Sequence, residues 1–553
     1  MSAAVRISRL IGSIGAVVLG TSVSAQVRLD QADPTIVEQA LPRPVAPTPQ
    51  QPAVQVDTAA AGKAAGPAVT GMINAVVIDG IDPADAARYA PAYLSVIGRE
   101  LGEAELAGLA GRIADVARQD GYPFAVALIG AQRVENGVVR VTLDLGKIDA
   151  VRVIGAASPR ADAILNRLLV TDKPVRRDQL EKAILLVGDV PGVRVVNSRY
   201  VRQNGFGILL VTISVDRFSA YAQLDNRGSA EVGPIRSTIL ASARSLLQSG
   251  DEFAFLAAQT PVQPTEFAFV RGRYSAPVDD VGSVLSVAAS YGRSHPGASL
   301  KPLDVVGHSV DVAVAYSRPI ARSRATSLSS TTEFRAASID QTLAGRTIRH
   351  DRLATLTESL IGFTAAGPGT LRGEVGVTAG LPLAGVTHQG DAMTSRFDGD
   401  ARFALVGYTV DWTTKLAKPL TLVLASAGQL ASRPLLATAE IGIGGPAFAR
   451  AYDYAERTGD NGIMASMEIR ADAGRVIPGV IERLQLYGFV DGGKVSNLRD
   501  GFGGGELFST GAGGRFGIGT ADGMIEIALP LNADRFDTGD RSPRISLRLS
   551  KGF

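Results

Sequence analysis

From residue 217 to the end of the chain, apolar and polar residues alternate in short segments separated by clusters of Gly, Asp, Asn and Pro. Ile463 and Met467, for example, alternate with Met464 and Glu468. A period of two predicts strands with one apolar and one polar face. We count about sixteen such segments, and an even number of strands about ten residues long is typical of a membrane β-barrel. The segments start near residues 218, 236, 251, 265, 282, 306, 325, 351, 368, 399, 419, 462, 484, 506, 523 and 543.

A soluble β-sandwich or β-propeller is the alternative interpretation of this region. The region is long for a sandwich, and no blade repeat is visible. Aromatic residues make up only 6% of the chain and Trp412 is its single tryptophan, so any interfacial girdle must be thin or built from tyrosine. The pattern still favours a barrel of about 16 antiparallel strands over 217–553.

Upstream of residue 217 the periodicity is helical. Over 73–148 the order is strand, helix, helix, strand, strand, with Leu106, Leu109 and Ile113 on one helix face. The same order returns over 149–216, where Leu180 and Ile184 share a helix face. The two segments therefore predict two α+β modules that repeat an architecture rather than a sequence.

The N-terminus has the features of an export signal. A basic start is followed by an apolar stretch from Leu10 to Leu19 and by Val23-Ser24-Ala25, which predicts a signal peptide over 1–25. A single membrane anchor is the alternative, but the apolar stretch is short for it. Residues 26–72 are rich in Pro, Gln and Ala and predict a flexible linker, with a short plug-like helix near 33–41.

Composition and motifs exclude several functions. The chain has no cysteine, four scattered histidines and a net charge of +2, so we expect no thiolate or histidine metal site, no cofactor and no nucleic-acid partner. It contains no Walker-type sequence and no hydrolase or metalloprotease motif. We therefore do not expect an enzyme.

Two motifs carry candidate site residues. Gly445, Arg450 and Tyr452 lie in the longest gap between predicted strands, about 431–461, and Asp460 follows them. A second segment reads Phe489-Val-Asp491-Gly492, where alternation places Asp491 on the inner face of a strand. An inward carboxylate needs a cation or water, and the planar fork of an arginine can bond it bidentately. Arg450 is a suitable partner.

With these motifs, the two modules and a last strand that ends on Phe553, the chain resembles the two-partner secretion translocators of the TpsB type, which belong to the POTRA-plus-barrel superfamily. Residues 224–233 also match that family where the second POTRA module enters the barrel. The resemblance implies that the loop after the eleventh strand folds back into the lumen. There its arginine bonds the inner-wall aspartate, with Phe489 and Gly492 beside it. Ala449 and Ala451 depart from the family pattern, and Ala451 replaces a glycine.

The resemblance implies a pore in the outer membrane of a Gram-negative bacterium, with POTRA modules in the periplasm. They would recognise an unfolded exoprotein, which the pore passes to the cell surface without nucleotide hydrolysis. The implied partners are a large β-helical adhesin or hemolysin, outer-membrane lipid, and the chaperones and barrel-assembly machinery that insert the chain. An assembly insertase and a diffusion porin are the alternatives; the known insertases usually have more POTRA modules, and a porin needs none.

Overall fold

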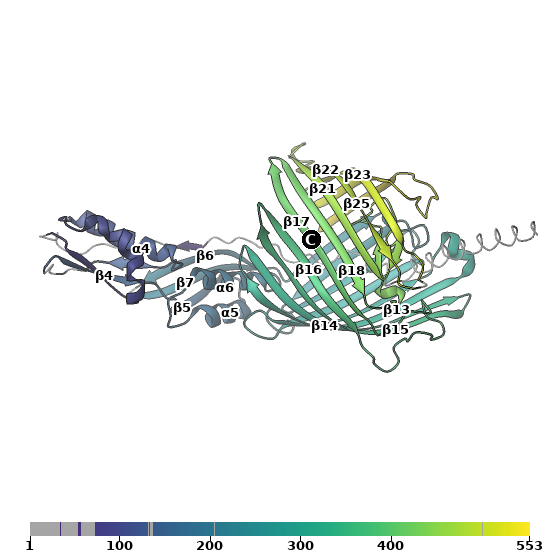
Figure 1. Cartoon of the computed structure of the whole chain (residues 1–553), viewed down its shortest axis with the longest axis horizontal. Coiled ribbons are helices and arrows are strands. Elements are labelled where there is room, and N and C mark those ends of the chain that lie inside the picture. Colours follow the sequence, from purple (N-terminus) through teal and green to yellow (C-terminus); the bar gives the residue numbers. More distant parts are fainter. Residues whose placement is uncertain are drawn as a thin grey trace, which may run out of the picture.

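Two small α+β modules lie in a row at one end of a large β-barrel (Figure 1). The computed structural model describes residues 34, 54–56, 72–130, 132, 136–203, 205–499 and 501–553. The predicted signal peptide and most of the predicted linker and its helix lie outside these residues. Within the described part of the chain, no helix is both long and apolar enough to cross a membrane.

Module 1 is a three-stranded sheet covered by helices. Its long helix α4 buries Leu106, Leu109 and Ile113 against the sheet, as its helical periodicity predicts. Glu105 closes the first turn of α4 by accepting a hydrogen bond from the Gly102 amide at 3.0 Å. The sheet order is β2-β4-β3. The elements are β2 (Ala75–Asp79), η2 (Pro83–Asp85), α3 (Ala86–Tyr93), η3 (Leu94–Val96), α4 (Glu103–Gln119), β3 (Val126–Leu128) and β4 (Val138–Asp144).

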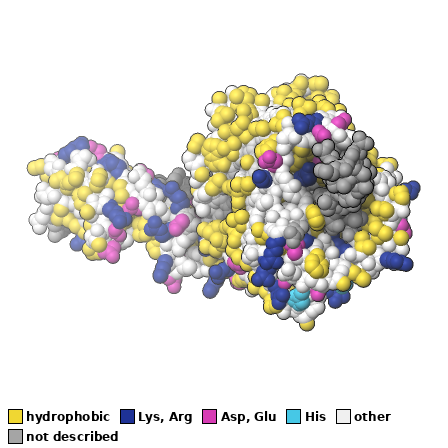
Figure 2. Space-filling model, turned by 45° about the vertical axis from the view of Figure 1, so that its right-hand side comes forward, with side chains coloured by type: hydrophobic (Ala, Val, Ile, Leu, Met, Phe, Trp, Pro, Cys, Tyr) yellow, Lys and Arg dark blue, Asp and Glu magenta, His cyan; other side chains and the backbone are white. Residues whose placement is uncertain are grey.

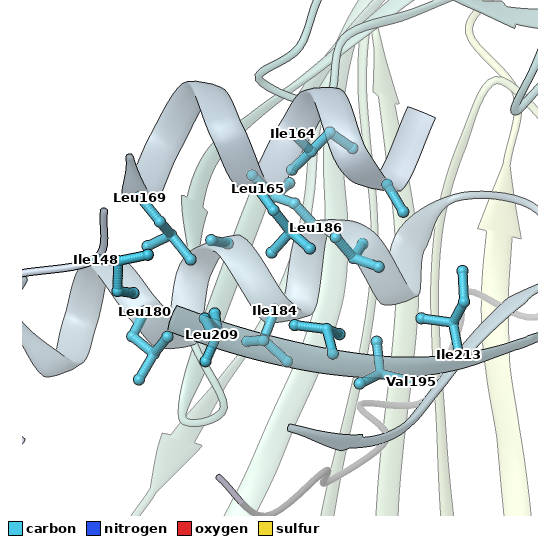
Figure 3. Close-up of a cluster of buried hydrophobic side chains, with 14 of the residues drawn as sticks. Ile148, Ile164, Leu165, Leu169, Leu180, Ile184, Leu186, Val195, Leu209 and Ile213 are labelled. Atoms are coloured by element: carbon cyan, nitrogen blue, oxygen red, sulfur yellow. The ribbon is translucent and has the colours of Figure 1, made fainter. Parts of the chain in front are cut away.

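Module 2 repeats this order and adds one strand from the predicted linker. Its helices pack on the sheet through a cluster of buried hydrophobic side chains (Figure 3). The short strand β1 (Val54–Val56) pairs in parallel with β6, because an extended segment can hydrogen-bond to an open sheet edge. The sheet order is β1-β6-β7-β5. The other elements are β5 (Ala150–Gly155), α5 (Pro159–Leu169), α6 (Arg177–Asp189), β6 (Val193–Gln203) and β7 (Phe206–Val215).

Module 2 is docked on the periplasmic turns of the barrel. Arg322, at the end of a barrel strand, donates two hydrogen bonds of 2.7 Å to Asp189 at the end of α6. Arg160 on α5 reaches Asp280 at 2.9 Å, and its amide donates to Ser249. These contacts fall on three neighbouring turns, so they fix the module to one side of the barrel mouth.

The described residues form a closed antiparallel barrel of sixteen strands, which confirms the predicted fold class. Each strand begins within about five residues of its predicted start. The strands are β8 (Phe218–Asp225), β9 (Arg236–Arg244), β10 (Glu252–Gln259), β11 (Phe267–Pro277), β12 (Val284–Ser294), β13 (Val305–Arg322), β14 (Thr326–Leu343), β15 (Arg346–Ala366), β16 (Gly369–Gly380), β17 (Ala404–Ala417), β18 (Leu420–Ala431), β21 (Asn461–Gly474), β22 (Arg483–Ser496), β23 (Gly505–Ile518), β24 (Ala521–Pro530) and β25 (Arg544–Gly552).

The barrel is apolar outside and polar inside. On β25, Leu547 and Leu549 face outward and remain exposed, whereas Arg544 and Ser546 face inward and are buried. Hydrophobic side chains cover much of the visible outer wall (Figure 2). Phe553 follows β25 and closes the seam with the first strand, because its amide donates to the Ala220 carbonyl at 2.8 Å. This distribution is that of a barrel with lipid around it and water within.

Candidate functional site

The segment between β18 and β21 turns inward and packs against the inner wall of the barrel. It contains η5 (Ala437–Ala439) and two short paired strands, β19 (Ile441–Ile443) and β20 (Arg457–Gly459). We call residues 444–456 the loop tip, and residues 432–443 with 457–460 the loop base. The tip residues Ala451 and Tyr452 share one buried cluster with Tyr487 and Phe489 of the inner wall. The loop tip therefore lies in the bore.

A tight turn connects the base to the tip. Gly444 and Gly445 have φ values of +115° and +102°, a region that favours glycine. A Cβ on Gly444 would lie 2.0 Å from the Asp453 carbonyl oxygen, so the turn also needs glycine for space. Ala449 adopts φ +54°, whereas Ala451 is not among the described residues with positive φ. The left-handed residue in this motif is thus Ala449, and Ala451 needs no glycine-like backbone.

Arg450 in the middle of the tip is surrounded by three carboxylates. Its Nε lies 3.0 Å from Asp491 Oδ2 on β22, and its Nη1 lies 2.6 Å from Glu468 Oε2 on β21. The same Nη1 lies 3.3 Å from Glu526 Oε2 on β24. We call these four residues the Arg450 cluster. The sequence suggested a fork on one carboxylate, but the guanidinium divides its contacts among three strands.

Other side chains extend and orient the Arg450 cluster. The Arg450 guanidinium lies over the ring of Phe489, 4.0 Å from its centroid. Tyr487 donates to Glu526 at 2.9 Å, and Arg227 reaches the other oxygen of Glu526 at 2.6 Å. Ser509 donates to Asp491. The cluster also gains cations from β21 and β23, where Arg470 and Arg515 contact Glu468.

A second set of contacts holds the rest of the tip. Tyr452 is buried, and its hydroxyl donates to the Ala533 carbonyl in the loop between β24 and β25 at 3.0 Å. Asp453 pairs with Arg544 on the last strand. Glu456 accepts hydrogen bonds from the amides of Asp453 and Phe536. The tip is therefore bound to five successive strands, β21 to β25, and to one outer loop.

Three candidate residues lie elsewhere. Asp460 belongs to the loop base and is fully buried at the extracellular rim. Gly492 follows the inward Asp491, so it lies on the outward face, where a Cβ would meet the Phe508 ring at 2.3 Å. That placement differs from the inner-wall position expected for Gly492, because adjacent strand residues point to opposite faces. Phe553 lies at the barrel seam, far along the chain from the loop.

Sequence reasoning missed the carboxylates that share Arg450 with Asp491. Glu468 and Glu526 both stand at inward positions of cleanly alternating strands, so a search for inward carboxylates on neighbouring strands would have found them. It also missed Arg396, which contacts Asp460, because nothing in the local sequence pairs that loop with residue 460.

The arrangement is a network of buried ion pairs between the loop tip and the inner wall. No group of three or more potential metal ligands occurs within the described part of the chain. Buried charges are stable only when they are paired, and removing one partner costs about 3–5 kcal/mol. The ion pairs therefore hold the tip against the inner wall of the bore.

Comparisons with known proteins agree with this architecture. The profile of the haemolysin secretion/activation proteins ShlB/FhaC/HecB matches residues 208–516, and that of the ShlB-type POTRA domain matches residues 72–146. The chain is 24% identical over 381 residues to the heme/hemopexin transporter protein HuxB of Haemophilus influenzae (strain 86-028NP), covering 68% of this chain and 67% of HuxB.

Two solved structures share the fold. CdiB from Escherichia coli superposes with a TM-score of 0.70 and 16% identity over 94% of this chain and 95% of CdiB. CdiB from Acinetobacter baumannii gives a TM-score of 0.62 and 17% identity over 96% of this chain and 99% of that protein. At these identities the likeness concerns the fold alone.

Proposed function

The chain belongs to the ShlB/FhaC/HecB family of haemolysin secretion/activation proteins, whose profile covers more than half of its length, and from this premise we propose how it exports its client. It is an outer-membrane secretion pore with periplasmic POTRA modules. An unfolded exoprotein binds the modules, displaces the loop tip from the bore and passes to the cell surface. One observation carries this proposal. The barrel is a closed ring of strands, and its bore is obstructed by the loop tip, which is held to the wall largely through ion pairs.

The two modules offer sheet edges where an extended client can add a strand. In module 1 the edge strands are β2 and β3, and in module 2 the strand β5 has a neighbour on one side only. Main-chain hydrogen bonds at such edges bind many sequences with little specificity. This suits a client that arrives unfolded. Its chemical class, a large β-rich adhesin or hemolysin, is inferred from the family.

The N-terminal segment is a second candidate obstruction. Of the predicted helix over 33–41, only Pro34 is described, and it is buried against the inward-facing Gly292 and Gly307 of β12 and β13. A Cβ on Gly292 would lie 2.7 Å from the Pro34 Cβ. Deleting residues 26–60 should therefore raise single-channel conductance. An unchanged conductance would leave the loop tip as the sole obstruction.

Transport is proposed to need no nucleotide. The chain has no Walker-type sequence and no other nucleotide motif. The energy would come from the client, which folds outside into a form that cannot slide back.

A deletion strain separates export from membrane insertion. Loss of the chain should abolish appearance of one large exoprotein at the surface or in the medium, and other outer-membrane barrels should remain at normal levels. If secretion continues while other barrels disappear, the chain is an insertase. The strain complemented with the intact chain is the control.

A further inference from the structure

A second buried arginine lies on the extracellular side, away from the Arg450 cluster. Arg396 belongs to the loop between β16 and β17, residues 381–403, which we call the rim loop. Its side chain is only 9% exposed. Its Nη1 lies 2.8 Å from Asp460 and 3.0 Å from Glu440, both in the loop base. Its Nε donates to Asp398 at 2.7 Å.

This arginine joins three extracellular loops. Besides the loop base, its Nη1 donates to the Asn497 side chain at 3.2 Å, and its Nη2 donates to the Leu498 carbonyl at 2.5 Å, both in the loop after β22. Asp460 is held from two further sides, because it also accepts the amides of Leu435 and Leu498 at 2.7 Å. Charge-assisted bonds in a buried site are the strong ones.

The loop base is also held to the rim by aliphatic packing. Leu435 and Leu436 are completely buried in a cluster with Leu353 and Phe403. The Ala437 amide donates to Ser395 of the rim loop at 3.1 Å. Separating the base from the rim would expose these two leucines as well as the charges of Arg396 and Asp460. The base therefore has an anchorage of its own, independent of the contacts that hold the tip.

We propose that Arg396 is a positioning residue that fixes the loop base to the rim, so that only the tip beyond Gly444 leaves the inner wall during export. The inference rests on the proposed function. The glycine pair at 444–445 marks the boundary, since it supplies a turn between the anchored and the mobile part. The pore then opens when the tip moves away from the inner wall, while the loop base and the extracellular rim keep their positions.

Cysteine accessibility on intact cells tests this separation, because the chain has no native cysteine. Ala437→Cys reports on the base and Ala451→Cys on the tip; both positions are buried. Each is combined with Arg396→Gln or Arg450→Gln and labelled with a membrane-impermeant maleimide. Arg396→Gln should raise labelling at 437 about tenfold, equivalent to about 1.4 kcal/mol. Arg450→Gln should raise labelling at 451 and leave 437 protected.

The matched control is Arg402→Gln, another rim-loop arginine, which is half exposed and pairs only with the nearby Asp400 among its described contacts. It should change neither reporter. If Arg450→Gln exposes position 437 as strongly as position 451, base and tip move as one body and the proposal is wrong. The proposal also fails if Arg396→Gln leaves position 437 buried.

Paired cysteines then test the separation during export. Ser395→Cys with Ala437→Cys ties the base to the rim, and Ser509→Cys with Ala451→Cys ties the tip to the wall, where the Ala451 amide lies 3.4 Å from the Ser509 oxygen. Oxidation should stop export only in the tip pair, and reduction should restore it. A base pair that stops export overturns the inference. Export through both oxidised pairs would contradict the proposed function instead, and the labelling result would still stand.

Discussion

The core of module 2 and the contacts that fill the bore of the barrel are both buried, but the first consists of hydrophobic side chains and the second includes charged ones. In module 2, Leu165, Leu169 and Leu209 are completely shielded within a cluster of apolar side chains. In the bore, Arg450 and Asp491 are shielded almost as well but meet as charges. Burial alone therefore does not distinguish a permanent core from a closure.

The difference follows from what each region must do. When an apolar core opens, exposing its surface to water costs about 25 cal/mol of free energy per Å² of apolar area. Water makes no contacts that replace those lost. A charged contact that opens exchanges each partner for water, which recovers much of the desolvation cost. A polar plug is thus held stably by its ion pairs when the pore is closed, and its charged side chains are hydrated at low cost when the pore is open.

The largest effect is expected at the Arg450 cluster. Arg450→Ala should abolish or sharply reduce export and leave the amount of protein in the membrane unchanged, because it removes the cation shared by three carboxylates. Asp491→Ala should resemble it, and the double variant should be no worse than either single change. Secretion assays with immunoblots of the outer membrane measure both. Strictly additive defects would argue against a shared function of Arg450 and Asp491. The control is Arg483→Ala, which changes an exposed arginine on β22, the strand that carries Asp491.

Next in size is the apolar core. Leu165→Ala should destabilise module 2 by about 2–5 kcal/mol, because the site is completely buried and leaves a cavity. Limited proteolysis of the detergent-solubilised full chain in urea measures it, with the exposed Arg167→Ala on the same helix as control. A loss below about 1 kcal/mol would mean that this core is not closely packed.

A somewhat smaller loss is expected on the lipid face. Ile527→Arg places a charge next to the inward Glu526 but on the outer wall, and it should cost about 2–4 kcal/mol near the middle of the bilayer. Leu531→Arg, just beyond the end of β24, should cost far less. Urea unfolding in lipid vesicles compares the two. Equal losses would mean that Ile527 lies no deeper in the bilayer than Leu531.

The smallest expected effect is a pH dependence at the rim. Burial is the main cause that raises the pKa of Glu440 to about 7, and nearby Asp460 adds to it, while Thr458 and Arg396 act against it. The folded base therefore holds a proton that the unfolded chain releases between about pH 4.5 and 7, so this group favours the closed base at low pH and less as pH rises.

Labelling at Ala437→Cys should accordingly increase from about pH 6 to about pH 8, after correction for thiol reactivity with an exposed reporter cysteine. Glu440→Gln should flatten the dependence, whereas Glu231→Gln in another extracellular loop should preserve it. A profile that Glu440→Gln leaves unchanged would assign the titration to a different group.

The sequence predicted the regular parts of the molecule well and its long-range polar contacts only in part. The strands and both modules follow from side-chain periodicity, which is a local property, as at Ile463 to Arg470. The proximity of Arg450 and Asp491 was suggested by the family resemblance and by inward alternation. Two features depend on the path of the loops across the barrel. One is the sharing of Arg450 among Glu468, Asp491 and Glu526, and the other is the set of loops that Arg396 joins. No local pattern encodes that path.

The docking of module 2 has a mechanical consequence. Its contacts fall on the turns beside β9 to β14, whereas the carboxylates of the Arg450 cluster lie on β21, β22 and β24. A load on the module therefore enters the barrel through turns that carry none of the three carboxylates around Arg450. The joint between module and barrel and the closure of the bore are separate structures, so each can be altered by substitution without touching the other.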